Sequence, residues 1–277
     1  MTAHDQLIDA DPPAVMVAEA ISLLENWFRK EGSVTVAFSG GADSALLAWV
    51  ANSVLGEGAS IVTAVSPSLA GREAEDCQSL AVEWRLNWST VETSEMEEAA
   101  YRKNDPDRCR HCKDALMDAL LPLAAGTVVL GVNTDDLGDH RPGQAAASMA
   151  GARFPYVELG IDKQMVRAAS QMIGLRTWDK PAAACLASRI PHGTEVSIRL
   201  LRRVERAEEV LHALHLGQVR VRDHGDIARI EVEPSAMGAL LEMRSSIEDA
   251  LQGLGYRYVT LDLGGFRSGS MNPVRPK

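Results

Sequence analysis

The sequence predicts an α/β protein, with a parallel sheet covered by helices on both faces and a smaller C-terminal α+β domain. Short apolar runs typical of buried strands alternate with helical runs through about the first 130 residues. These apolar runs are nearly continuous, as expected for strands covered on both faces. Beyond about residue 196 the order changes to helix, two neighbouring strands, helix and strand. We therefore expect an α/β domain at residues 1–176 and an α+β domain at residues 177–277.

The first helix is predicted at residues 14–30, where Val17, Ile21, Leu24 and Phe28 share one face and Gly32 ends the pattern. The further helices of this domain are expected at residues 45–55, 71–86 and 112–124. The strands are expected at residues 34–38, 60–65, 88–92 and 127–132. Ligands of such sheets bind outside the carboxyl ends of the strands, so the segments that follow the strands are candidates for a site.

A small-residue loop, Ser39-Gly40-Gly41-Ala42-Asp43-Ser44, follows the first strand and precedes a helix. Glycines let backbone N–H groups approach a phosphate, and the helix dipole favours negative charge at that end. The string lacks the Lys-Ser/Thr ending of a Walker loop. An ordinary strand-to-helix turn, which also uses Ser, Gly and Asp, is the alternative.

An acidic segment that begins at Asn133 follows the fourth strand. Its carboxylates suit Mg²⁺ on ATP or a substrate amide or hydroxyl, and a solvated acidic loop is the alternative. Because both segments follow parallel strands, we expect them to share one site. The candidate ATP- and pyrophosphate-binding residues are Ser39, Gly40, Gly41, Asp43, Ser44, Asn133 and Asp136.

The C-terminal domain is predicted to contain helices at residues 196–216 and 235–253, a hairpin of strands 218–222 and 228–233, and a last strand at 256–262. We expect its sheet to be antiparallel. Arg220 and Arg222 alternate along a strand, so both point to one face, where they suit a phosphate or carboxylate. Two solvated arginines are the alternative.

Four cysteines raise the question of metal or redox chemistry. Cys109 and Cys112 form a CxxC pair, which suits a soft metal, an iron–sulfur cluster or a redox disulfide, or two structural thiols. Cys185 lies in a loop near Lys180 and Arg189, whose charges favour the thiolate; a small buried hydrophobe is its alternative. Cys77 has acidic neighbours and is assigned no role.

The formal net charge of −10 argues against broad nucleic-acid binding, which needs basic surfaces. The first residues show no basic or apolar region of a signal peptide, and no apolar run reaches the length of a membrane span. We therefore expect a cytoplasmic protein without membrane or nucleic-acid partners, and cysteines that do not form disulfides.

Five stretches of the chain resemble LarE-type ATP-dependent sulfur transferases, a family of the PP-loop ATP pyrophosphatase superfamily. They lie at residues 38–44, 107–113, 131–143, 184–193 and 262–272. The resemblance implies Mg²⁺-ATP as cosubstrate and adenylation of a carboxylate of pyridinium-3,5-dicarboxylic acid mononucleotide. Sulfur then converts that carboxylate to a thiocarboxylate, in biosynthesis of the nickel-pincer nucleotide cofactor of lactate racemase.

The resemblance also implies roles for individual residues. Cys185, Ser188 and Arg189 fall in its catalytic stretch, while Arg220 and Arg222 would bind the substrate's phosphate or carboxylates. The sulfur would come from a [4Fe-4S] cluster on Cys109, Cys112 and Cys185, which we favour, or from Cys185 itself.

A metal in the second domain would fall to Glu208 or Glu209, and a homo-oligomer is expected from the family. Another PP-loop enzyme, either a tRNA thiolase or an amide-forming synthetase, is one alternative. A non-catalytic nucleotide or iron–sulfur carrier is the other.

Overall fold

The computed structural model describes residues 12–138, 142–181 and 183–267. The chain forms two compact units. The first unit comprises residues 1–66, 71–94 and 109–183, and the second comprises residues 67–70, 95–108 and 184–277. Two short segments of the N-terminal half therefore belong to the second unit. Within the described ranges, no helix is both long enough and apolar enough to cross a membrane.

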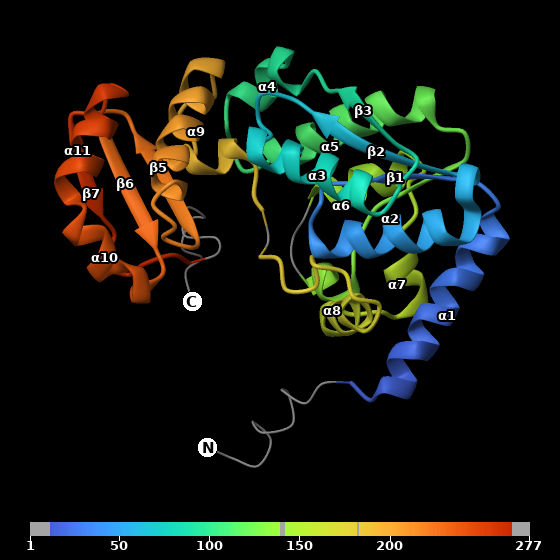
Figure 1. Cartoon of the computed structure of the whole chain (residues 1–277). Helices are drawn as coiled ribbons and strands as arrows, with labels where there is room; N and C mark the ends of the chain where they lie inside the picture. Colours follow the sequence, from blue (N-terminus) through green and yellow to red (C-terminus); the bar gives the residue numbers. More distant parts are fainter. Residues whose placement is uncertain (1–11, 139–141, 182, 268–277) are drawn as a thin grey trace. The chain divides into compact units, whose positions relative to one another are not determined.

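The first unit is built on a parallel four-stranded sheet, as predicted (Figure 1). Its strands are β1 (Val34–Ala37), β2 (Ala59–Val65), β3 (Trp88–Glu92) and β4 (Thr127–Val129), in the order β3-β2-β1-β4. Because β1 pairs with both β2 and β4, the loop after β1 opens at the middle of the sheet edge. The fourth strand is three residues shorter than expected, because the chain leaves the sheet before Gly131.

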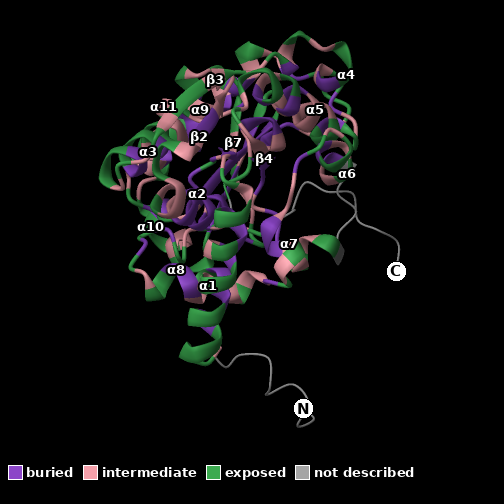
Figure 2. Cartoon of the chain, turned by 90° about the vertical axis from the view of Figure 1, so that its right-hand side faces the viewer, coloured by how far each residue is buried: buried purple, intermediate pink, exposed green. Residues whose placement is uncertain are grey.

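Helices cover both faces of this sheet, as expected for nearly continuous apolar strands. The helices of the first unit are α1 (Ala14–Glu31), α2 (Ala42–Leu55), α3 (Gly71–Glu83), α5 (Arg108–Leu120), α6 (Pro142–Met149), α7 (Pro155–Leu159) and α8 (Lys163–Met172). Successive strand residues divide between two cores: Ile61 packs with α1, α2 and α8, whereas Val62 packs with α5 and α6. The helix α2 is largely buried (Figure 2).

The sequence prediction placed the start of α5 at residue 112, and this was wrong, because the helix begins at Arg108. The helices α6 to α8 were not predicted. Pro142 and Pro155 are the first residues of α6 and α7. Proline is tolerated at the first position of a helix because the backbone N–H there has no hydrogen-bond partner within the helix.

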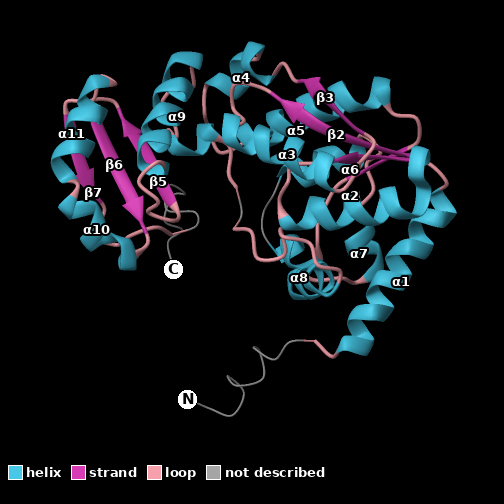
Figure 3. Cartoon of the chain, viewed as in Figure 1, coloured by secondary structure: helices cyan, strands magenta, loops and turns pink. Residues whose placement is uncertain are grey.

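The second unit carries a three-stranded sheet of β5 (Val219–His224), β6 (Ile227–Val232) and β7 (Tyr258–Leu261), in that order. The β5–β6 hairpin is antiparallel as predicted, but β6 and β7 are parallel, so the expectation of an antiparallel sheet was wrong. The physical reason is the helical crossover between β6 and β7, which returns the chain before β7 starts (Figure 3). The expected single helix is divided at Met243 into α10 (Met237–Glu242) and α11 (Arg244–Gly253).

The two faces of this sheet differ in character. Val219, Val221 and Ile230 belong to the core that packs against α9 (Ile198–His212), α10 and α11. The residues between them along β5 and β6 alternate to the opposite face, and they are Arg220, Arg222, Arg229 and Glu231. A short helix, α4 (Ala99–Arg102), completes the helices of the second unit. The strand pattern therefore builds an apolar core on one side and a face of charged groups on the other.

Candidate functional site

The loop after β1 has the shape of an anion site. The Ser39 N–H donates to Ser44 Oγ at 3.1 Å, and that hydroxyl donates to the Gly41 carbonyl at 3.2 Å. Gly40 has a φ of +67°, which a residue with a side chain rarely adopts. No side chain caps the N-terminus of α2, and among the described residues the N–H groups of Gly40, Gly41 and Ala42 donate no hydrogen bond. These groups at the positive end of a helix are available to phosphate oxygens.

The underside of the loop is packed closely. A Cβ placed on Gly40 would lie 3.0 Å from Cys77 Sγ and 3.7 Å from Lys180 Nζ. Cys77 is fully buried, and burial raises the pKa of its thiol to about 11. The thiol is therefore neutral at physiological pH and packs against the loop at Gly40. The Lys180 ammonium also lies close to Gly40.

The structure brings the acidic segment against the loop after β1. Asn133 Nδ2 donates to Asp43 Oδ1 at 3.0 Å. A Cβ on Gly131 would lie 2.9 Å from the Ser44 backbone nitrogen, so glycine allows this close approach. The Asn133 N–H donates to Asp136 Oδ2 at 3.2 Å, and Asn133 itself is buried. Asn133 and Asp136 thus shape the segment that borders the loop.

Two residues that the sequence did not single out complete the surroundings of Asp43. Lys163 Nζ lies 2.5 Å from Asp43 Oδ2, and the Tyr156 hydroxyl donates to the Asp43 carbonyl at 2.9 Å. Both residues are more than 110 positions away along the chain, so no local pattern signals them. Because Lys163 neutralises Asp43, the loop has less negative charge to repel a phosphate.

The CxxC pair lies at the start of α5, with Cys109 in its first turn and Cys112 at its fifth residue. Cys109 is exposed and Cys112 is half-buried. Residues three apart share a helix face, and the positive end of a helix favours thiolates, so the pair fits two ligands of a soft metal or cluster. Within the described part of either unit, no group of three or more His, Cys, Asp or Glu side chains is placed to hold a metal. Cys185 belongs to the second unit, and its meeting with the pair stays a prediction.

Cys185 precedes a 3₁₀ turn at Leu186–Arg189 and is half-buried. Arg189 holds the chain at this point, because its Nη1 donates to the carbonyls of Ala184 at 2.6 Å and of Cys185 at 3.1 Å. The remainder of its guanidinium pairs with Glu208 at 2.9 Å through two hydrogen bonds. Arg189 therefore positions the backbone that carries the thiol.

The two candidate glutamates differ sharply. Glu208 is buried, and besides Arg189 its Oε1 accepts the Val221 N–H at 3.0 Å. Glu209, the next residue, is exposed. Glu208 thus joins α9, β5 and the turn after Cys185.

Arg220 and Arg222 point to the same charged face, as the strand alternation predicts, and both are buried rather than solvated. Arg222 donates to Glu231 Oε2 from Nε at 3.0 Å and from Nη2 at 2.6 Å, and its Nη1 donates to the Ser188 carbonyl at 3.3 Å. Arg220 donates to the Val219 carbonyl at 2.7 Å and lies over the Phe266 ring at 5.2 Å. The face therefore contacts the turn that contains Ser188.

A segment from the N-terminal half holds the same turn from another direction. Asn104 has a φ of +58°, and its Nδ2 donates to the Pro191 carbonyl at 2.8 Å and the Thr194 carbonyl at 2.9 Å. Arg108 donates to the Ala187 carbonyl at 2.9 Å and also to Asn104. Sequence reasoning missed Asn104, and only its position before Asp-Pro gave a signal, for a turn. Asp139, His140, Arg141 and residues 268–272, which fall in the resembling stretches, lie outside the described residues.

No protein-family model matches the chain. It is 43% identical over 268 residues to an uncharacterized protein of Synechocystis sp., covering 95% of this chain and 100% of that protein. An uncharacterized protein of Methanocaldococcus jannaschii is 26% identical over 243 residues, covering 86% and 92% of the two chains. The pyridinium-3,5-bisthiocarboxylic acid mononucleotide synthase of Lactiplantibacillus plantarum is 39% identical over 249 residues, covering 88% of this chain and 90% of that enzyme. At this identity and coverage, the chain belongs to the LarE-type family that includes this synthase.

Proposed function

We propose that this protein is an ATP-dependent sulfur transferase that converts a carboxylate of pyridinium-3,5-dicarboxylic acid mononucleotide into a thiocarboxylate. The observation that carries the proposal is the uncapped N-terminus of α2, which follows the loop at Gly40 and Gly41. The chain that contains it is related to a pyridinium-3,5-bisthiocarboxylic acid mononucleotide synthase. Unpaired N–H groups at a helix N-terminus suit a triphosphate. Lys163 supports this use of the loop by neutralising Asp43.

The first step is adenylation. A carboxylate is a poor electrophile, so one of its oxygens attacks the α-phosphorus of ATP and pyrophosphate leaves. The loop at Ser39–Ser44 binds the departing phosphates through its backbone N–H groups, and Asp136 and its neighbours are the proposed contacts for Mg²⁺. The product is an acyl adenylate, whose carbonyl carbon is open to a sulfur nucleophile.

The second step transfers sulfur to that carbonyl carbon and releases AMP. We favour a [4Fe-4S] cluster held by Cys109, Cys112 and Cys185 as the group that supplies sulfide when it is bound. Support comes from within the second unit, where Arg108, the residue before Cys109, donates to Ala187, two residues after Cys185. In the other version, Cys185 gives up its own sulfur and becomes dehydroalanine.

The remaining residues have positioning and binding roles in the proposal. Arg189 fixes the carbonyl of Cys185, and the carbonyl of Ser188, in the same turn, accepts a hydrogen bond from Arg222. Arg220 and Arg222 bind the substrate's phosphate or carboxylates, so Arg222→Ala should raise the substrate KM. The product is proposed to be a precursor in biosynthesis of the nickel-pincer nucleotide cofactor. The protein itself is proposed to be a homo-oligomer in the cytoplasm.

The test measures pyrophosphate release and the intact mass of anaerobically prepared protein, with ATP and the dicarboxylated mononucleotide. The proposal expects pyrophosphate release only when the mononucleotide is present; release independent of that substrate, or none at all, contradicts it. Loss of the mass of one H₂S at Cys185 would establish the sacrificial route. The cluster route is supported if thiocarboxylate product forms while the protein mass stays unchanged. This route also expects that the joint Cys109→Ser and Cys112→Ser substitution abolishes formation of that product.

A further inference from the structure

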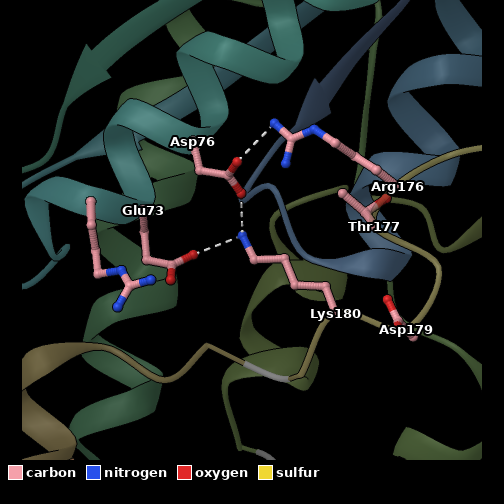
Figure 4. Close-up of a pocket in the computed structure, with 7 residues that line it drawn as sticks. Glu73, Asp76, Arg176, Thr177, Asp179 and Lys180 are labelled. Carbon is pink, nitrogen blue, oxygen red and sulfur yellow. Dashed lines mark hydrogen bonds and ion pairs between the residues drawn. The ribbon is translucent and has the colours of Figure 1, made fainter. Parts of the chain in front are cut away.

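A second group of charges lies in the first unit, in a cavity of about 390 Å³. It is lined by side chains of α3 and of the segment that follows α8, and these are Arg72, Glu73, Asp76, Arg176, Thr177, Asp179 and Lys180. Figure 4 shows the Lys180 ammonium between the carboxylates of Glu73 and Asp76. None of these seven residues has a part in the proposed chemistry so far.

Lys180 is the centre of this cavity. Its Nζ lies 2.9 Å from Glu73 Oε2 and 2.6 Å from Asp76 Oδ2, and its side chain is only 19% exposed. Burial alone would lower the pKa of this lysine, but its hydrogen bonds to Asp76 and Glu73 outweigh burial and raise it. The ammonium is therefore charged throughout the physiological range.

Lys180 also borders the phosphate loop. Its Nζ lies 3.7 Å from the position that a Cβ on Gly40 would occupy. Among the described residues, the N–H groups of Gly40, Gly41 and Ala42 in that loop donate no hydrogen bond, and the ammonium lies close to Gly40. A lysine at this position can reach an oxygen of a phosphate held by the loop, since it is flexible and carries three donors.

The two carboxylates are not equivalent partners of Lys180. Asp76 also pairs with Arg176 at 2.9 Å, so it keeps a cation if Lys180 moves. Glu73 has no other ion pair in the described part of the chain. Glu73 is therefore the group that competes with an incoming anion for the ammonium.

We propose that Lys180 is a displaceable cation, which exchanges Glu73 for a phosphate oxygen of the β,γ-diphosphate of ATP and of the released pyrophosphate. This inference rests on the proposed function, because that function generates pyrophosphate at the loop. Arg72, which is exposed and has no ion pair within the described ranges, lies in the same cavity as a second cation for the departing anion.

The test titrates the full-length chain with inorganic pyrophosphate by isothermal calorimetry. Lys180→Met should weaken binding by about 10- to 100-fold, the range for one charge-assisted hydrogen bond. Glu73→Gln should tighten binding, because it releases Lys180 while leaving the lysine in place. Glu83→Gln is the matched control: Glu83 lies on α3 and pairs with Arg176 at 2.8 Å, and this substitution should leave the affinity unchanged.

If the Lys180–Glu73 ion pair only stabilises the fold, Glu73→Gln should not tighten pyrophosphate binding. If Glu73→Gln weakens pyrophosphate binding or leaves it unchanged, the exchange is wrong, even where Lys180→Met fails to fold. Wild-type protein that binds pyrophosphate with the same affinity as Lys180→Met would also overturn it, with the proposed function intact. The variants could show the expected changes in pyrophosphate affinity while the protein releases no pyrophosphate from ATP in the presence of the mononucleotide. That result would refute the proposed function and still support Lys180 as a pyrophosphate-binding residue.

Discussion

Arg189 and Glu208 form a buried two-point ion pair, with Nε to Oε1 and Nη2 to Oε2 both at 2.9 Å. The pair connects the turn after Cys185 to α9, and the same arginine holds the Cys185 carbonyl. Two charges in a buried setting stabilise only as a pair, because either one alone would lack a partner. The position of the candidate thiol therefore depends on a carboxylate 23 residues further along the chain.

Glu208→Ala should disrupt this turn. Removing one partner of a buried pair costs about 3–5 kcal/mol, and here it also frees the Val221 N–H. Hydrogen exchange in peptides of α9 and β5 should rise, and sulfur transfer should be lost while nucleotide binding by the first unit remains. Glu209→Ala, at the exposed neighbour, is the control and should stay within about 0.5 kcal/mol of wild type. Equal effects of the two substitutions would contradict the positioning role.

Gly40→Ala should impair nucleotide binding. The φ of +67° disfavours any side chain, and the new methyl would meet Cys77 Sγ at 3.0 Å. We expect a rise of about tenfold or more in the Kd for ATP, which corresponds to ~1.4 kcal/mol. Gly32→Ala is a matched control with a φ of +74° and no atom within 4 Å, so it should reduce stability without changing ATP affinity. Adding Cys77→Ala to Gly40→Ala should restore part of the affinity; no recovery would show that contact with sulfur is not the cause.

The cysteines should differ in their rate of alkylation. Cys77 is buried with a pKa of about 11, so at pH 7 only about one molecule in 10,000 carries its thiolate. Cys109 is exposed in the first turn of α5. Treatment of the folded chain with iodoacetamide, followed by peptide mass spectrometry, should label Cys109 and leave Cys77 unmodified. Unfolding in urea should make all four cysteines reactive, and early labelling of Cys77 would show that the packing against the loop at Gly40 opens.

Much of the first unit follows from local pattern. An apolar run, a Gly pair and a helical run, all within 22 residues, predict the strand at residues 34–37 and the helix that follows it. The approach of Asn133 to Asp43 was expected, because parallel strands bring their carboxyl ends to one edge. Lys163 and Lys180 were beyond such reasoning, because their partners at Asp43 and Glu73 lie more than 100 residues away.

In the second unit, the alternation along β5 and β6 predicted that Arg220 and Arg222 share a face, but not what covers them. Their burial arises from contacts with Glu231, Phe266 and the turn at Ser188, which sequence spacing does not encode. The parallel pairing of β7 was missed although a signal for it was present, because the sequence predicts a helix between β6 and β7 and such a crossover is the connection that parallel strands use. The domain boundaries and the roles of the site residues stay predictions.

Acid should weaken the first unit through Asp76. Burial alone would raise the pKa of this carboxyl, but hydrogen bonds and charges from Lys180 and Arg176 outweigh burial and hold it below its ordinary value of 3.8. The unfolded chain therefore takes up this proton at a higher pH than the folded chain does. The stabilisation is complete above the unfolded pKa and is lost as pH falls through the lower folded pKa.

Urea unfolding between pH 6 and pH 2, followed by tryptophan fluorescence, measures this effect. All five tryptophans lie in the first unit, at positions 27, 49, 84, 88 and 178, so the signal reports that unit alone. The unfolding free energy of wild type should fall below about pH 4, and Asp76→Asn should show a shallower fall from a lower starting value. Glu75→Gln, which alters an exposed carboxylate one residue away, is the control and should follow wild type. An Asp76→Asn curve parallel to wild type would mean that Asp76 takes up its proton at the same pH in the folded and unfolded chains.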